Sequence, residues 1–172
     1  MGIRALRSAY ERLLEWIVIA LMAVLAAEVT LGVVFRTIGM SLSWYDEVAS
    51  VLLAWLTFYG AALGALKRAH IGFPGLVTSM PPAWRVAFVV LAELLVIAFF
   101  ILLGWVGYKV LEVLGSDGLV SLPWVSVAVT QSVIPISAAL FVVAEAFNLP
   151  QVIREAMTGS RSQASDLAEM TH

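Results

Sequence analysis

Four long apolar runs, separated by short polar connections, are the dominant pattern along the chain. They cover residues 17–35, 48–66, 86–108 and 122–144, and Glu28 and Glu93 are the only charged side chains inside them. A membrane-crossing helix needs about 20 mostly apolar residues, whereas the strands of a membrane barrel are shorter and alternate apolar with polar positions. Turn residues such as Gly39 and Gly115 fall between the runs. We therefore predict an all-α integral membrane protein with four transmembrane helices.

The residues before the first run have a helical period of their own. Apolar side chains recur there at intervals of three or four residues, at Ile3, Leu6, Tyr10, Leu13 and Ile17. This spacing predicts an N-terminal interfacial amphipathic helix that leads into the first span. A signal peptide fits less well, because the apolar run is too long and continues beyond Glu28. We expect a single four-helix membrane domain over residues 1–154 and, because the rest is polar and rich in Ser, a mobile cytoplasmic tail over residues 155–172.

The distribution of basic residues predicts how the helices are oriented. Eight of the ten Lys and Arg residues lie in the N-terminal segment, in the connection between the second and third runs, or in the tail. Only Arg36 and Lys109 lie on the other side. Because cytoplasmic loops carry an excess of Lys and Arg, we expect both termini in the cytoplasm (N-in, C-in). Five of the six Trp residues fall near predicted span ends, as interfacial aromatics do, and Trp55 is the exception in mid-helix.

The amino-acid composition excludes several classes of function. The chain is 62% hydrophobic and 13% charged, whereas a soluble domain is roughly 45–50% apolar and about 25% charged, so a soluble enzyme is excluded. The net charge of −2 provides no basic field for nucleic acid. There is no Cys, and the two His residues, His70 and His172, lie outside the apolar runs. We therefore expect no enzyme, no metal site and no cofactor such as haem held by two intramembrane histidines.

The two intramembrane carboxyls, Glu28 and Glu93, have two interpretations. A charge at mid-membrane costs about 2.5–3.5 kcal/mol, which the large apolar residues of each span offset at about 0.3–0.6 kcal/mol each. Each carboxyl is either a proton or cation site or a group hydrogen-bonded within a helix interface. The runs contain no second acid beside either residue and no base, which favours the interface. The stripe from Glu93 continues through Gly104 and Gly107 and predicts a face packed on protein.

Two further features concern helix ends and helix packing. Ser43 precedes Asp46 and Glu47, a pattern typical of a capped helix start; alternatively, the two acids form a salt bridge to Arg36 or contact another protein. Small residues favour close helix packing in the second run, at Gly60, Ala61 and Gly64.

In the fourth run Pro135 predicts a kink. Polar side chains near Pro135 are expected to satisfy the backbone groups that the kink frees: Thr130, Gln131, Ser132 and Ser137.

No internal repeat is visible, and four short-looped helices with so few polar residues are too little for an autonomous transporter. The chain is therefore interpreted as an auxiliary membrane subunit. The alternative is a self-sufficient, proton-coupled exporter that uses Glu28, in the manner of four-helix multidrug pumps. The strong Lys and Arg asymmetry speaks against the dual insertion seen among such pumps.

An ordered set of residues carries a family resemblance. It reads Arg36-x-x-Gly39, Ser43-Trp44-x-Asp46-Glu47, Trp55-x-x-Phe58-x-Gly60-Ala61 and Lys67-Arg68-x-His70-Ile71. This set resembles the small membrane subunit of tripartite ATP-independent periplasmic (TRAP) transporters, the DctQ-like family. The resemblance implies a scaffold in the inner membrane of a bacterium or archaeon. It also implies a larger membrane subunit that holds the substrate and sodium sites, and a periplasmic binding protein that delivers an organic acid.

The resemblance also suggests partner contacts. Trp44, Asp46 and Glu47 become candidates for the outer docking surface, with Arg36 beside them. Four residues of the second span become candidates for packing on the large subunit, together with Gly64: Trp55, Phe58, Gly60 and Ala61. His70 and Ile71 would begin a cytoplasmic loop whose apolar residues lie in the membrane interface, at Ile71, Phe73, Leu76, Val77 and Met80.

Overall fold

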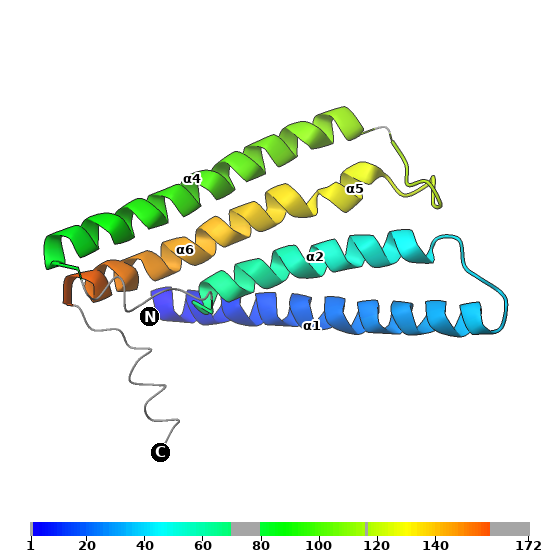
Figure 1. Cartoon of the computed structure of the whole chain (residues 1–172), viewed down its shortest axis with the longest axis horizontal. Helices are drawn as coiled ribbons and strands as arrows, with labels where there is room; N and C mark the ends of the chain where they lie inside the picture. Colours follow the sequence, from blue (N-terminus) through cyan, green and yellow to red (C-terminus); the bar gives the residue numbers. More distant parts are fainter. Residues whose placement is uncertain (1, 70–79, 116, 159–172) are drawn as a thin grey trace, which may run out of the picture.

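The computed structural model describes residues 2–69, 80–115 and 117–158 of the chain. Its helices are α1 Gly2–Thr37, α2 Tyr45–Leu66, α4 Pro82–Leu114, α5 Val127–Gln131 and α6 Val133–Thr158 (Figure 1). Four helical stretches are long and apolar enough to cross a membrane, the last formed by α5 and α6 together. The prediction of an all-α protein with four membrane-crossing helices is confirmed. Of the predicted interfacial loop, all residues except Met80 lie outside the described ones.

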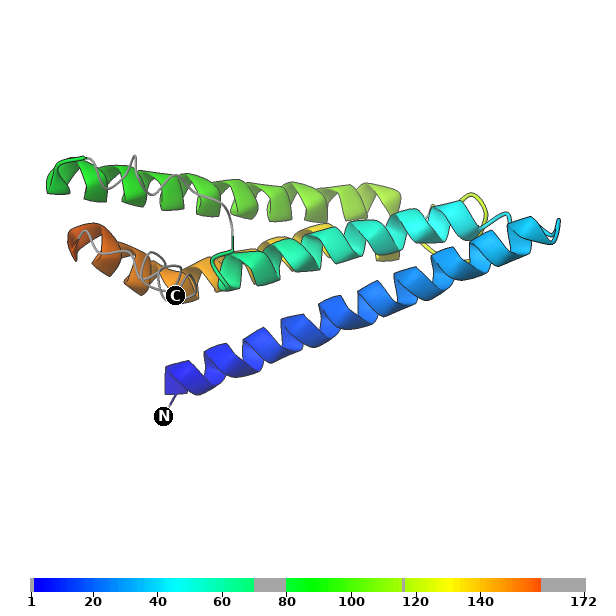
Figure 2. The same cartoon turned by 60° about the horizontal axis from the view of Figure 1, so that its bottom comes forward.

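The helices form an open layer. In the layer α1 packs on α2, α2 packs on α6, and α6 packs on α4, and Figures 1 and 2 show the same order from two directions. The edge helices α1 and α4 each have one main neighbour, whereas α2 and α6 have two. Only 33% of the most apolar stretch of α5 and α6 is buried, and 0% of that of α4. Most of the apolar surface therefore faces outward, toward lipid or a partner.

The layer has two distinct ends. The start of α1 and the end of α6 lie at one of them, called here the terminal end, where α2 also ends and α4 begins (Figure 1). Residues 38–44 and the connection from α4 to α5 lie at the opposite end, called here the loop end (Figure 1). An even number of crossings thus places the two described chain ends on the same side.

The N-terminal segment predicted as an interfacial helix is the first part of α1, which runs without a break from Gly2 to Thr37. The predicted segment is therefore not a separate helix, although Leu6 and Leu13 of its predicted apolar face are exposed. Leu14, by contrast, is fully buried against the rest of the layer, and the Tyr10 hydroxyl donates a hydrogen bond to Leu140 O at 2.6 Å. Helical period alone did not separate the lipid-facing Leu13 from the protein-facing Leu14.

The fourth crossing differs from its prediction in two ways. The kink expected at Pro135 is a break at Ser132 between α5 and α6, because Pro135 has no N–H to bond one turn back and is tolerated in the first turn of a new helix. In addition, α6 continues past residue 144 and through Pro150 to Thr158. Residues 155–158, which the sequence assigned to the tail, are therefore helical, and residues 159–172 lie outside the described part.

Small residues bring α4 and α6 close together. A Cβ atom on Gly107 would lie 2.8 Å from Ile134 Cγ2, and one on Gly104 would lie 3.2 Å from the Ala138 Cβ. Next to them the rings of Phe100 and Phe141 stack, with centroids 3.6 Å apart and planes at 9°. The predicted protein-facing stripe of α4 is thus confirmed.

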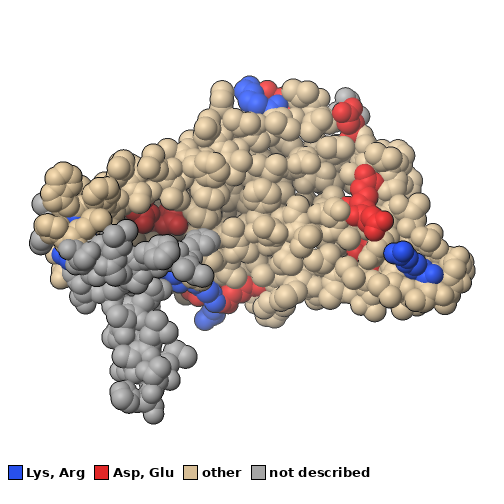
Figure 3. All heavy atoms as spheres, viewed as in Figure 1, with Lys and Arg blue, Asp and Glu red and all other residues tan. Residues whose placement is uncertain are grey.

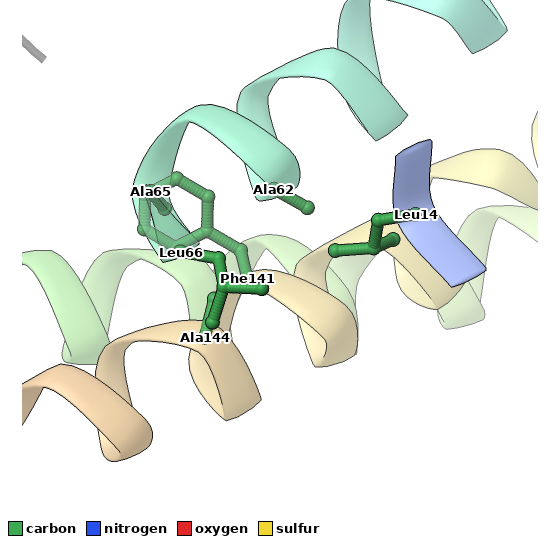
Figure 4. Packing of buried hydrophobic residues seen from close by; sticks show 6 residues of the cluster. All are labelled: Leu14, Ala62, Ala65, Leu66, Phe141 and Ala144. Carbon is green, nitrogen blue, oxygen red and sulfur yellow. The ribbon is translucent and has the colours of Figure 1, made fainter. Parts of the chain in front are cut away.

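A second contact joins α1, α2 and α6 toward the terminal end. Its buried cluster is shown in Figure 4 and consists of Leu14, Ala62, Ala65, Leu66, Phe141 and Ala144. Three of the six are Ala, so the helix backbones approach closely where lipid supplies no hydrophobic drive. Near the loop end α1 and α2 meet again, where the ring of Tyr45 lies on Gly32 and leaves no space for a Cβ atom.

The α4–α6 contact is tested by Gly107→Leu. The new side chain collides with Ile134, so we expect the free energy of unfolding to fall by about 1–3 kcal/mol, as overpacking does. Gly60→Leu is the matched control, because nothing lies within 4 Å of its Cβ position. Thermal unfolding in detergent, followed by circular dichroism, compares the two. Equal midpoints for both variants would contradict the close contact.

Candidate functional site

Charged side chains gather toward the two ends of the layer on the face shown in Figure 3, with an uncharged band between them. Between the ends, a groove of about 520 Å³ runs along α4 and α6 and is lined by apolar or small side chains such as Gly104, Pro135 and Ala138. No group of three or more potential metal ligands occurs among the residues described. The two charged ends and the apolar groove offer surfaces for contact with other molecules.

At the loop end, Glu47 of α2 holds the connection between α4 and α5. Its carboxylate accepts hydrogen bonds from Val120 N at 2.9 Å and Ser121 N at 2.8 Å, and also from the Ser121 hydroxyl. A backbone bridge between Gly118 and Ser126 closes the same connection. The loop is thus tied to α2 by a charge-assisted network.

The apolar tip of this loop projects outward. Val120 is 93% exposed and Trp124 is 80% exposed. Asp46 is also exposed, and Trp44 is partly buried beside it in the chain. The sequence singled out Trp44, Asp46 and Glu47 but missed Val120 and Trp124. The sequence gives little indication of these two residues, because they lie in a short loop that has no helical spacing of apolar positions.

Two expectations about the start of α2 are wrong. The helix begins at Tyr45 with Trp44 as its N-cap, and no side chain caps it, so Ser43 lies one position too early. The two acids do stand in the first turn. Arg36 is exposed at the end of α1, and no ion pair joins it to Asp46 or Glu47, all three being described residues.

In the middle of α2, Trp55 is engaged within the chain. Its indole N–H donates to Thr130 O at 2.8 Å, a carbonyl freed by the break before Pro135. This hydrogen bond explains why a Trp stands in mid-helix. A contact of Trp55 with a large subunit therefore stays a prediction, and it can involve only the part of the ring that α5 leaves uncovered.

Another face of α2 has no neighbour among the described residues. Residues spaced three or four apart lie on it and form what we call the free stripe: Ser50, Leu53, Thr57 and Gly60. The first three are exposed, and nothing lies within 4 Å of the Cβ position of Gly60. The other small-face candidates, Ala61 and Gly64, are partly buried, as is Phe58. The predicted packing face of Gly60 thus finds no partner in the described part of the chain.

At the terminal end, a buried amide satisfies the last carbonyls of α2. Asn148 of α6 is 1% exposed, and its Nδ2 donates to Ala65 O at 2.8 Å. Arg7 of α1 donates to Leu66 O and to Asn148 Oδ1, both at 3.3 Å. Helix C-termini leave carbonyls without intrahelical partners, so three helices meet to supply them.

Ion pairs, and a side chain that caps the end of α6, lie near this buried amide. Arg68, at φ 54°, donates to both carboxylate oxygens of Glu155 at 2.8 and 2.9 Å. Arg85, which is buried, donates to Ala156 O at 2.7 Å. Lys67 lies on the solvent-exposed side of this junction, and its hydrogen bond to Glu15 raises the pKa of its ammonium group. The terminal end is therefore the polar junction of all four crossings.

The two intramembrane carboxyls occupy different surroundings. Glu93 is hydrogen-bonded to Glu145 of α6, and the charge of Arg68 acts on both. The predicted runs contain no second acid because the fourth ends at residue 144, and the structure brings the next residue, Glu145, to Glu93. Polar residues at positions 145, 148, 151 and 155 recur at intervals of three or four, and this helical spacing indicates that α6 continues. Glu28, by contrast, is buried, and neither of its oxygens has a hydrogen-bond partner in the described structure.

The polar junction is tested by Asn148→Leu, which keeps the approximate size but removes the hydrogen bonds of Asn148 to Ala65 O and from Arg7. Ala65 O keeps its bond from Arg68 N and Arg7 keeps its bond to Leu66 O, so we expect the free energy of unfolding to fall by about 0.5–1.5 kcal/mol for each of the two hydrogen bonds lost. Gln151→Leu, at an exposed position one turn along α6 where only an exposed hydrogen bond to Glu155 is lost, is the control. Thermal unfolding in detergent distinguishes them, and an unchanged midpoint for Asn148→Leu would refute its role at the junction.

Comparison with family models supplies the context for these surfaces. Residues 25–155 match the model described as "Tripartite ATP-independent periplasmic transporters, DctQ component". A comparison with curated proteins finds no match. The family match includes the whole of α2, α4 and α5, the end of α1 and most of α6. It covers well over half of the chain and agrees with the resemblance carried by residues 36–71. The chain therefore belongs to the DctQ family, the small membrane subunits of TRAP transporters.

Proposed function

We propose that this multi-pass membrane protein is the scaffold subunit of a transporter for sodium-driven uptake of an organic acid. In this proposal a periplasmic binding protein delivers the acid, and a large membrane subunit holds the substrate and sodium sites. The observation that carries the proposal is the open helix layer, which leaves whole helix faces without a partner in a chain of this family.

The free stripe of α2 is the proposed contact for the large subunit. Gly60, Thr57 and Ser50 are small, and small residues let helices approach closely inside a membrane. Their face is not covered by α1 or α6, the two helices that pack on α2. Among the sequence candidates, Gly60 supports this contact most strongly, and Phe58, Ala61 and Gly64 lie on the same helix.

The terminal end is proposed to face the cytoplasm of a bacterial or archaeal cell. Most of the basic residues gather there or in the segments that begin and end there, including Arg7, Lys67, Arg68, Arg85 and Arg154. Positively charged residues are retained on the cytoplasmic side during insertion. The loop end, with Arg36 and Lys109, then faces the periplasm.

The loop end is the proposed docking surface for the binding protein. Val120 and Trp124 present an exposed apolar tip, and aromatic side chains such as that of Trp124 are enriched at protein contacts. Glu47 supports the tip through its hydrogen bonds to Val120 and Ser121. Asp46 adds an exposed negative charge beside it. In this proposal Glu47 therefore orients the docking surface and does not itself contact the binding protein.

Assembly tests the scaffold role. Gly60→Leu fills the free stripe, so we expect the recovery of a co-expressed, affinity-tagged large subunit with this chain to fall at least tenfold, with uptake falling in parallel. Ala98→Leu, at an exposed position on the edge helix α4, is the matched control and should assemble normally. Normal assembly and uptake with Gly60→Leu would reject the free stripe as the contact.

The exporter alternative predicts a different result for the carboxyls. If the ions that drive uptake bind the large subunit, Glu28→Gln and Glu93→Gln should leave sodium-driven uptake at neutral pH within about twofold of wild type. Uptake into proteoliposomes that contain all three components measures this. Complete loss of uptake with normal assembly, or tight pH-dependent binding of a lipophilic cation by the chain alone, would favour the exporter.

A further inference from the structure

A shallow apolar groove follows α4 toward the loop end. Its first part, of about 520 Å³, lies between α4 and α6 and is hollowed at small residues such as Gly104 and Ala139. Its second part, of about 440 Å³, continues along α4 past Lys109 to Leu114. Trp105 lines both parts, so the two meet at this residue and form one groove along α4.

The tryptophans of α4 indicate how deep this groove lies in a bilayer. Trp84 and Trp105 are both exposed, and a rise of about 1.5 Å per residue separates them by about 31 Å along the helix. This length matches the hydrocarbon core of a bilayer, which is about 30 Å thick, and Trp is enriched at the two boundaries of that core. The first part of the groove therefore lies inside the core, in the half nearer the loop end. Lys109 stands one helical turn beyond Trp105, at the level of the lipid headgroups.

The mouth of the groove carries two opposite charges. Lys109 Nζ donates to Glu112 Oε2 at 2.9 Å, and both side chains are about half exposed. The ammonium group has three donors, and the carboxylate oxygens accept several hydrogen bonds, so each member of the pair has capacity for a further charged ligand. Lys109 is suited to a phosphate, and Glu112 is suited to an ammonium group.

The apolar part of the groove excludes a polar solute. Its lining side chains carry no charge, and a polar group buried there without a hydrogen-bond partner would be costly. An acyl chain needs no such partner and fills the hollow by packing alone. A helix of another subunit is the other candidate occupant. The charge pair at the mouth favours a phospholipid, because every phospholipid carries its phosphate at this depth.

We propose that this groove binds phosphatidylethanolamine from the leaflet at the loop end, with an acyl chain between α4 and α6, the phosphate on Lys109 and the ammonium group on Glu112. The zwitterionic headgroup is complementary to this pair. An anionic lipid matches Lys109 but meets the like charge of Glu112, and the quaternary ammonium group of phosphatidylcholine has no N–H to donate. The site is separate from the free stripe of α2 and requires neither the large subunit nor the transported acid.

Native mass spectrometry of the full chain tests the lipid site. The chain is reconstituted into nanodiscs with equal amounts of phosphatidylethanolamine, phosphatidylglycerol and phosphatidylcholine, and is then released in a mild detergent. The wild type should retain one lipid, predominantly phosphatidylethanolamine. Lys109→Gln removes a charge-assisted hydrogen bond, so the ratio of lipid-bound to lipid-free chain should fall about tenfold. Arg36→Gln, at another exposed base of the loop end, is the matched control and should retain the lipid like the wild type.

Two further variants test the headgroup and the groove separately. Glu112→Gln should abolish the preference for phosphatidylethanolamine over phosphatidylglycerol. Ala139→Phe fills the groove from an exposed position and should lose the retained lipid, whereas Ala98→Phe, at an exposed position of α4 outside the groove, should keep it. Neither Phe variant should reduce the recovery of a co-expressed, affinity-tagged large subunit.

Three results would overturn the proposal: lipid retention by Lys109→Gln equal to that of the wild type, a wild type that prefers phosphatidylglycerol, or Ala139→Phe with its lipid intact. Loss of the large subunit from Ala139→Phe, with lipid retention unchanged, would assign the groove to a helix of that subunit instead. If Ala139→Phe does not fold, the exposed positions of Lys109→Gln and Glu112→Gln still decide the question.

Discussion

Close approach of helix backbones at small residues is the constraint on which this layer depends. Lipid supplies no hydrophobic drive between helices, so association rests on packing and on hydrogen bonds. Each main contact has its own small residues: Gly104 and Gly107 between α4 and α6, Ala62 and Ala65 in the cluster that joins α2 to α6, and Gly32 beneath Tyr45. Where no described residue lies against a small one, as at Gly60, a helix face is left open in the described part of the chain.

Hydrogen bonds add direction to this packing. The last carbonyls of α2 are satisfied by Asn148 of α6 and Arg7 of α1, which fixes where α2 ends relative to both neighbours. The break before Pro135 frees Thr130 O, and Trp55 binds it. At both places a helix interruption that would be costly in lipid is repaired by a side chain from the next helix. These bonds make α2 and α6 the centre of the layer.

An open layer fits the role of a subunit better than that of a self-contained transporter. Its central apolar groove has few polar groups, its charges gather at the ends, and α2 has a stripe that no described helix covers. The two ends differ in design. The terminal end is a dense polar junction that ties all crossings together, whereas the loop end presents an apolar tip on one short connection supported by Glu47. Ion pairs and helix caps are thus concentrated on the side of the chain ends.

The apolar runs by themselves determined the four crossings, because the need for about 20 apolar residues depends only on composition. The stripe from Glu93 through Gly107 likewise determined which face of α4 packs on protein. The tertiary structure alone decided which helix meets that face, how far α6 extends, and that the helices form an open layer. The reason is that helical period shows which residues share a face but not what lies opposite. Glu145 and Asn148 are polar residues in a helix that α6 extends beyond the predicted span, and only the tertiary structure shows their hydrogen-bond partners on α4, α2 and α1.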